Sequence, residues 1–150
     1  MRKAVTISII LLAVLLGVFF YVGFNYEGSL PEAFCEGDNC VVRVIDGDTF
    51  ILGNNESVRL LCVNAPEIGK VGSDEAAAFL SSLIEGREVR LERDVSDRDK
   101  YGRLLRYVYV NVSSGSEEQE LFVNRELVHE GFAEVYIYGD DVEKCREIGE

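Results

Sequence analysis

The sequence has little of what a histidine- or cysteine-based metal centre needs. It contains a single histidine, His129, and four cysteines, none of which forms a Cys-x-x-Cys pair. Structural zinc sites are usually built from such pairs, completed by further cysteine or histidine ligands. A zinc site is therefore the weaker interpretation of these residues. Internal repeats and low-complexity tracts are also missing, which excludes a repeat architecture.

Positive charge is scarce as well. The chain has 15 lysines and arginines against 27 aspartates and glutamates, which gives a net charge of −12. Arg2 and Lys3 are the only charged residues before Asn25, so the rest of the chain carries −14. An acidic protein repels polyanions at long range, and tight, sequence-independent DNA binding depends on a basic surface. The charge argues against such binding, but it allows a site that holds one phosphate locally.

One long uncharged run is present, from residue 4 to residue 24. Its 21 residues are enough to cross a bilayer as a helix. The run ends in bulky aromatic residues and has no Ala-x-Ala cleavage site, so we expect an uncleaved anchor rather than a cleaved signal peptide. The basic residues before it should stay in the cytoplasm, which places the domain outside; a cleaved segment would make the protein secreted.

After this segment we expect a linker over residues 25–39 and one compact domain over residues 40–150. Outside the cytoplasm the cysteines can form disulfides. Cys35 and Cys40 flank a turn-like sequence, and a bridge from Cys62 to Cys145 would then complete two disulfides. Four cysteines allow three pairings, however, and the sequence does not choose among them.

The sequence of the domain predicts an α+β fold that is mainly β. The helix expected over residues 73–86 has Ser73 as a possible cap, Gly86 at its end and an apolar stripe at helical spacing, which comprises Ala76, Phe79, Leu80, Leu83 and Ile84. The other expected elements are strands over 40–44, 49–52, 57–63, 88–94 and 104–110, a polar loop over 113–119, a helix over 123–130, extended chain over 132–138 and a weak helix in the tail. About five short strands with one long intervening helix fit a five-stranded Greek-key barrel of the oligonucleotide/oligosaccharide-binding (OB) type, with two to three helices.

Two carboxylates flank a glycine in the sequence Asp46-Gly47-Asp48, between the first two expected strands. Calcium prefers oxygen ligands from carboxylates, carbonyls and water, so this motif could contribute to a calcium site. Asp-Gly is also a common turn, and a purely structural turn is about as plausible for the motif alone. The further ligands of a calcium-binding helix-loop-helix are missing.

An arginine lies inside the third apolar strand, and a constrained glutamate follows it. The guanidinium of Arg59 matches phosphate oxygens in a bidentate manner, although a salt bridge to a core carboxylate would explain it equally well. Pro66 fixes the turn before Glu67, whose carboxylate could accept a proton from water. An ordinary exposed glutamate is the simpler explanation for Glu67 in isolation.

A second group of cations surrounds an aromatic residue in the sequence Lys100-Tyr101-Gly102-Arg103. Tyr101 could stack on a base, and Arg103 could hold a phosphate from another side. A charged hairpin turn with Gly102 in the left-handed region is the alternative.

Taken together, these motifs resemble the staphylococcal nuclease (thermonuclease) family. The resemblance runs from about Val41 to Tyr138 and includes the order and spacing of all the motifs above, together with Val123-Asn124, Leu127-Val128 and Gly131-Phe132-Ala133. It implies a calcium-dependent phosphodiesterase that cuts DNA and RNA at the 5′-ester bond and leaves 3′-phosphates.

The resemblance also implies a role for each matching residue. Asp48 would bind Ca²⁺ directly, with Asp46 behind it, and the backbone carbonyl of Ala65 would add a ligand. Arg59 and Arg103 would hold the phosphate and stabilise the transition state, and Glu67 would act as the general base. Lys100 and Tyr101 would lie near a terminal phosphate and Tyr136 by the base.

One departure from the family bears on the metal. Asn64 stands where the family usually has an aspartate, and its amide oxygen binds calcium without contributing charge. We therefore expect weaker calcium binding. The sequence predicts a membrane-anchored external nuclease, monomeric and without an identifiable protein partner. The alternative is a binding module for nucleic acid or protein that kept the barrel and lost catalysis.

Overall fold

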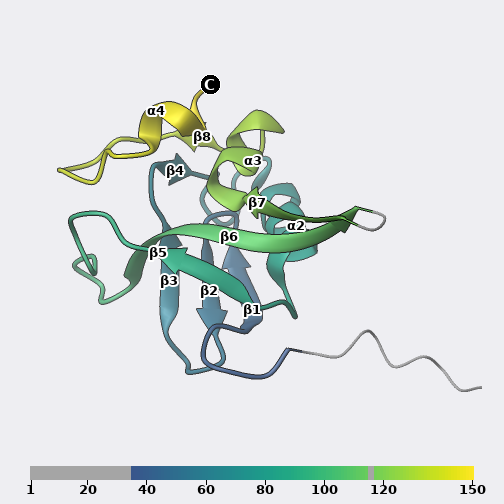
Figure 1. Ribbon diagram of the computed structural model, residues 1–150. Coiled ribbons are helices and arrows are strands. Elements are labelled where there is room, and N and C mark those ends of the chain that lie inside the picture. Colours follow the sequence, from purple (N-terminus) through teal and green to yellow (C-terminus); the bar gives the residue numbers. More distant parts are fainter. Residues whose placement is uncertain (1–34, 115–116) are drawn as a thin grey trace, which may run out of the picture. The chain divides into compact units, whose positions relative to one another are not determined.

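The computed structural model describes residues 35–114 and 117–150 (Figure 1). The chain folds mainly into β-structure with few helices, and its strands are β1 (Val41–Asp46), β2 (Thr49–Leu52), β3 (Ser57–Leu60), β4 (Val63–Asn64), β5 (Val89–Glu92), β6 (Leu104–Ser114), β7 (Glu117–Phe122) and β8 (Glu134–Val135). The helices are α2 (Ser73–Ile84), α3 (Val123–His129) and α4 (Cys145–Ile148). The expected anchor over 4–24, and the linker up to residue 34, lie outside the described residues. Within the part described, no helix is both long enough and apolar enough to span a bilayer.

The main sheet has the order β1-β2-β3-β6-β5, and β7 pairs with β6 as an additional strand. The β3–β6 pair is parallel and the remaining pairs are antiparallel. A bridge between Cys40 and Glu88, with a hydrogen bond from the Val41 N–H to the Arg87 carbonyl (2.9 Å), brings the β1 edge to the β5 edge. The sheet therefore curls towards closure, which is consistent with the expected OB-like barrel.

Helix α2 packs its apolar stripe into the core, as its spacing predicts. Ala76, Leu80 and Ile84 are fully buried, and the other members of the stripe pack partly buried against the same core. The chain leaves the helix at Gly86, whose φ of 76° suits a residue without a side chain. The prediction that Ser73 caps the helix is wrong. Gly72 occupies the cap position without a side-chain hydrogen bond, and Ser73 is the first helical residue and is buried.

The segments after α2 differ from the prediction in two places. Much of the polar stretch 113–119, expected as a loop, continues β6 and β7. A ladder such as the pair of Ser113 with Glu118 is held by its backbone hydrogen bonds and needs no apolar side chains. The extended chain expected over 132–138 contains only the two-residue strand β8, which pairs with β4. In the tail, the expected weak helix is the single short helix α4.

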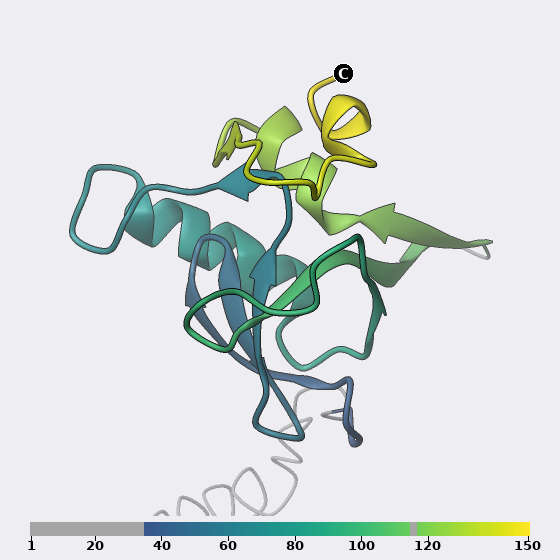
Figure 2. The same cartoon turned by 90° about the vertical axis from the view of Figure 1, so that its left-hand side faces the viewer.

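A buried asparagine joins α3 to the strands beneath it. Asn124 is fully buried, and its side-chain oxygen accepts from the Val108 N–H (2.8 Å). Its amide nitrogen donates to the carbonyls of Leu61 (2.9 Å) and Arg106 (3.3 Å). These bonds fix the chain between β3 and β4. Figures 1 and 2 both show β4, α3 and α4 gathered at one end of the domain.

Candidate active site

Asp48 is the centre of a buried polar cluster at the start of β2. Its side chain accepts hydrogen bonds from the backbone N–H of Ala65 (2.9 Å) and from the hydroxyl of Thr49 (3.0 Å). The guanidinium of Arg59 lies 3.0 Å from the same carboxylate. Asp46 supports the turn from behind, because its carboxylate accepts from the N–H of Asp48 (3.1 Å). The Asp-Gly-Asp sequence is therefore a turn that also presents a carboxylate to the site.

Burial raises the pKa of Asp48 to about 6, and the opposing effect of Arg59 and of the Ala65 N–H does not cancel it. Asp48 is only 7% exposed, so the charged form of its carboxylate loses most of its hydration. A group with this pKa is ionised at neutral pH. A bound cation would favour the charged form further.

Arg59 reaches Asp48 from β3 and is fixed on its other side by the backbone. One guanidinium nitrogen donates to the carbonyls of Leu60 and Val63, both at 2.7 Å. Burial lowers the pKa of Arg59, while the Asp48 carboxylate raises it. Arginine remains charged at neutral pH even when such effects act on it. Arg59 therefore forms the expected salt bridge to a buried carboxylate, and its side chain also lines a pocket.

Arg103 approaches the same cluster from the loop before β6. Its Nε donates to Asp99 (2.7 Å), and a terminal nitrogen lies 3.4 Å from the hydroxyl of Thr49. Asp99 also accepts from the N–H groups of Tyr101 and Arg103, which organises the turn between them. Although partial burial acts to raise the pKa of Asp99, the bonds from Arg103 and Tyr101 hold it below its usual value. Thr49 thus lies between the two arginines.

Asp99 and Thr49 are positioning residues that the sequence reasoning did not assign. Asp99 could have been found from its spacing, because an aspartate four residues before an arginine on a tight turn is a natural ion pair. Thr49 gives no comparable signal, since a threonine at the start of a strand is common.

A pocket of about 460 Å³ opens beside this cluster. Its lining includes five of the expected site residues, namely Arg59, Lys100, Tyr101, Arg103 and Tyr136. The Lys100 ammonium lies 4.9 Å from the centre of the Tyr101 ring, and Tyr101 is 73% exposed. Tyr136 stacks with Tyr138 at 6.4 Å between ring centres. Cations and exposed aromatic rings together suit a nucleotide, which combines phosphates with flat bases.

The structure does not bring Glu67 or Asn64 into contact with the cluster. Both side chains are exposed, and within the described residues the Glu67 carboxylate has no hydrogen-bond or ion-pair partner. Asn64 lies in β4 directly opposite Glu134. The two residues are nevertheless near the cluster in sequence, because Ala65, which donates to Asp48, lies beside Asn64 and two positions before Glu67.

The donor atoms around Asp48 fit a hard cation in kind but supply few charges. The carboxylates of Asp46 and Asp48 and the carbonyl of Ala65 are oxygen ligands of the kind that Ca²⁺ prefers. The amide oxygen of Asn64 is of the same kind, but its side chain is exposed and lies outside the cluster. In the described part of the chain, no three histidine, cysteine or acidic residues are grouped so that they could hold a metal. A cation at Asp48 would also compete with Arg59 for the carboxylate.

Comparisons with known proteins point to one family of nucleases. The family model described as staphylococcal nuclease homologue matches residues 57–149. The thermonuclease of Staphylococcus intermedius is 33% identical over 148 residues, which cover 91% of this chain and 83% of that protein. The micrococcal nuclease of Shigella flexneri is 38% identical over 65% of this chain and 58% of its own length. Endonuclease YncB of Bacillus subtilis is 39% identical over 64% of this chain and 47% of its own length.

Proposed function

The chain belongs to the family of the staphylococcal nuclease homologues, and on that premise we propose that it is a nuclease that uses Ca²⁺ to hydrolyse phosphodiester bonds of DNA and RNA. The observation that carries the proposal is the convergence of Asp48, Arg59 and Arg103 around Thr49, with both arginines lining one pocket. Two guanidinium groups are thereby available to one phosphate, and one carboxylate to a cation beside it. A purely structural barrel would have no use for this arrangement.

The two arginines would bind and polarise the phosphate. Phosphodiester hydrolysis builds negative charge on the non-bridging oxygens, and guanidinium groups fixed in advance stabilise that charge. Arg59 is fixed by two carbonyls and Asp48, and Arg103 by Asp99, so neither has to be ordered during the reaction. Removing one such donor costs about 10²-fold or more in rate by analogy with oxyanion holes.

Glu67 would accept the proton of the attacking water. Its exposed carboxylate has no competing partner among the described residues, so it is free to bind a water molecule. Asp48, Asn64 and Ala65 would hold Ca²⁺, and a bound cation supplies positive charge beside the attacked phosphate. Lys100, Tyr101 and Tyr136 would hold the neighbouring phosphate and base.

The location of the enzyme belongs to the same proposal. Residues 4–24 would anchor the chain in a membrane with the domain of residues 40–150 outside, as a monomer. The supporting observations are the length of the uncharged run and the two disulfides, Cys35–Cys40 and Cys62–Cys145, since disulfides persist in oxidising compartments.

The direct test is cleavage of a single-stranded DNA oligonucleotide by the purified full chain, with calcium and with chelator. We expect calcium-dependent cutting that Glu67→Gln lowers by about 10²-fold or more. Glu75→Gln is the matched control, because Glu75 is another exposed glutamate, at the start of α2, and the charge change is the same. No cutting at millimolar calcium by a folded protein would reject the enzyme and favour the binding module.

A further inference from the structure

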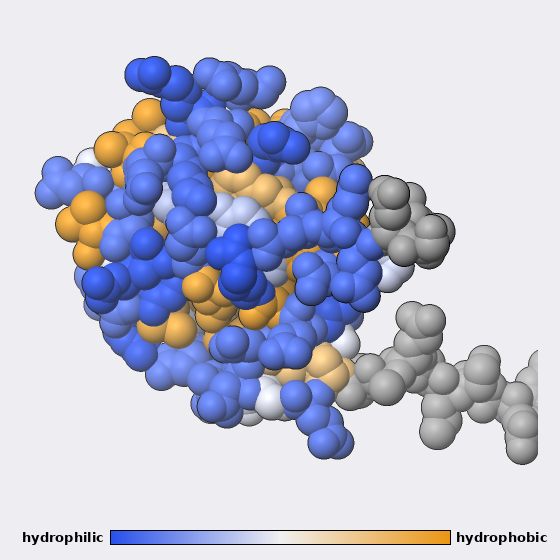
Figure 3. All heavy atoms as spheres, in the orientation of Figure 1, coloured by the Kyte–Doolittle hydropathy of each residue, from blue (hydrophilic) through white to orange (hydrophobic). Residues whose placement is uncertain are grey.

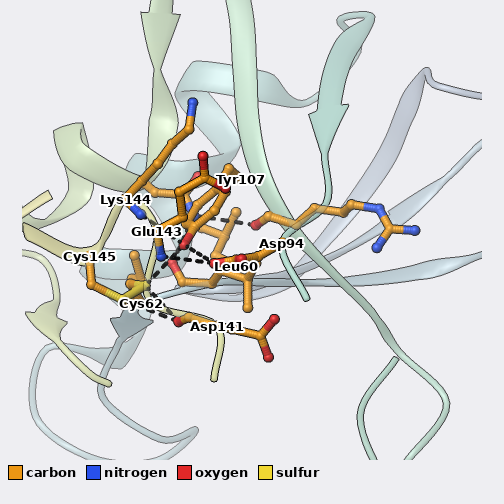
Figure 4. Close-up of a disulfide and its surroundings, with 12 residues drawn as sticks. Leu60, Cys62, Asp94, Tyr107, Asp141, Glu143, Lys144 and Cys145 are labelled. Carbon is orange, nitrogen blue, oxygen red and sulfur yellow. Dashed lines mark hydrogen bonds between the residues drawn. A yellow bond between two sulfur atoms is a disulfide. The ribbon is translucent and has the colours of Figure 1, made fainter. Parts of the chain in front are cut away.

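We propose that the disulfide between Cys62 and Cys145 is a positioning element for the substrate pocket, so that its reduction weakens substrate binding. This inference rests on the proposed function. The bridge joins the segment between β3 and β4 to helix α4, over a sequence separation of 83. Figure 4 shows it beside Tyr107, Asp94 and Asp141.

The Cys62 end of the bridge lies in a short segment that bonds to two residues of the pocket lining, Arg59 and Tyr136. Arg59 donates to the carbonyls of Leu60 and Val63, which lie two positions before Cys62 and one after it. The carbonyl of Cys62 itself accepts from the N–H of Tyr136 (3.0 Å). One short segment thus supports a phosphate-binding arginine and a base-side tyrosine, and Cys62 itself lines the pocket.

The backbone at Cys62 is not one that the sequence would favour. Its φ of 58° lies in the left-handed region, which costs a non-glycine residue about 1 kcal/mol or more. Such a conformation persists only where its surroundings hold it. The bridge to Cys145, together with the Asn124 hydrogen bond to Leu61, provides that constraint.

The Cys145 end belongs to a tail that forms another part of the pocket lining. Gly139 and Asp141 line the pocket, and Asp141 accepts from the N–H of Ser96 (2.7 Å). Its carbonyl oxygen lies 3.5 Å from the sulfur of Cys62, a polar contact because a disulfide sulfur carries no hydrogen. The bridge therefore binds the segment under Arg59 to the tail that lines the pocket.

Further bonds hold the tail in the absence of the bridge. The hydroxyl of Tyr107 donates to Asp94 (2.8 Å) and accepts from the N–H of Lys144 (3.2 Å), and Asp94 also accepts from the N–H of Glu143 (3.0 Å). The Lys144 ammonium lies 2.9 Å from Glu92. We therefore expect reduction to leave the domain folded and to loosen the pocket.

The chemistry of the change is a simple thiol–disulfide exchange. A dithiol such as dithiothreitol donates two electrons, the bond between the sulfurs of Cys62 and Cys145 breaks, and each sulfur takes up a proton. The dithiol closes to its own cyclic disulfide. Removing the reductant and adding oxidised glutathione reverses the exchange.

The second disulfide provides a matched control. Cys35 and Cys40 are joined over a sequence separation of 5, and neither lines the pocket. The segment from Cys35 to Cys40 contacts the residues just before β5 instead. The Cys35 N–H donates to the carbonyl of Gly86, and Cys40 forms an isolated β-bridge with Glu88. Losing this bridge removes a disulfide without touching the segment under Arg59.

The test measures KM and kcat for a single-stranded oligonucleotide in three proteins. One is the oxidised full chain. The second carries Cys62→Ser and Cys145→Ser, and the third carries Cys35→Ser and Cys40→Ser. We expect the first pair to raise KM about tenfold while kcat falls less, because Arg59 keeps Asp48 as a partner. The second pair should leave both constants unchanged. Reduction and reoxidation of the wild-type chain should reproduce the rise in KM and its recovery.

Three results would overturn the proposal. One is an unchanged KM in the Cys62 and Cys145 variant. Another is an equal effect of both cysteine pairs. The third is loss of the folded circular dichroism spectrum together with kcat and KM, which would show that the bridge only stabilises the fold. An oxidised wild-type chain that cuts nothing would instead reject the proposed function, so the two failures are distinguishable.

Discussion

At the scale of single residues, the buried carboxylate of Asp48 couples folding to pH. Burial raises its pKa from 3.8 to about 6 in the folded protein, so between these values the folded chain holds a proton that the unfolded chain releases. The protonated Asp48 therefore stabilises the folded state. This contribution is complete below pH 3.8 and is lost as the pH rises through about 6. In the absence of metal, we expect the ionisation of Asp48 to lower the free energy of unfolding by on the order of 2 kcal/mol between pH 4 and pH 7.

Urea unfolding in chelator at several pH values would measure this effect. Other carboxylates also titrate in the range, so the comparison is with Asp48→Asn, which lacks the ionisation. The wild-type unfolding free energy should fall with pH relative to that of the variant. Parallel curves for the two proteins would contradict the prediction.

Asn64 is the residue expected to limit calcium affinity. Asn64→Asp would place a carboxylate beside Ala65 and should tighten calcium binding about tenfold, which corresponds to about 1.4 kcal/mol. The same change puts like charges opposite each other, because Asn64 pairs with Glu134 across β4 and β8. The metal-free variant should therefore be slightly less stable than the wild type, and calcium should reverse the difference.

Calorimetric calcium titration would test this expectation. Asn111→Asp is the control, since Asn111 is exposed on β6 and the substitution adds the same charge there. Equal affinity in the wild type and Asn64→Asp would show that Asn64 is not a ligand.

At the scale of elements, the Asp46–Asp48 turn packs between the residue that follows β4 and helix α2. A Cβ on Gly47 would lie 2.5 Å from the Cβ of Ala65 and 2.6 Å from that of Ala76, closer than real contacts allow. Gly47→Ala should therefore cost about 1–3 kcal/mol through overpacking and should weaken calcium binding by displacing Asp48.

Thermal unfolding and calcium titration of Gly47→Ala would check both parts of this prediction. Gly149→Ala is the comparison, because its added Cβ would come no closer than 3.3 Å to Val135. Destabilisation by Gly149→Ala as large as that by Gly47→Ala would contradict the packing argument.

Elements whose pattern is local could be predicted from the sequence. The stripe of α2 and the stop at Gly86 depend on neighbours in sequence, and both are confirmed. The sequence also indicates Arg59 and Arg103, because a guanidinium inside an apolar strand needs an anionic partner and a second pair of cations follows in a turn. The parallel pairing of β3 with β6, the approach of Cys40 to Glu88 and the choice of disulfide partners depend on tertiary packing, so no local pattern specifies them.

At the scale of the whole molecule, the acidic charge should govern how salt affects the enzyme. Hydrophilic residues cover much of the face in Figure 3, and the net charge is −12. Repulsion of nucleic acid is long-ranged and screened by salt, whereas the arginines act at contact. We expect kcat/KM for an oligonucleotide to rise severalfold between about 10 and 100 mM sodium chloride. A steady fall over this range, as for a basic nucleic-acid-binding protein, would contradict it.

The bridge from Cys62 to Cys145 has one more consequence, for the survival of the protein among proteases. The loop after Glu67 is the natural place for a first cut, since Ile68 is 71% and Val71 fully exposed. That loop lies inside the stretch that the bridge closes. A single nick there leaves two polypeptides that remain covalently joined, so neither can diffuse away and the sheet keeps all its strands.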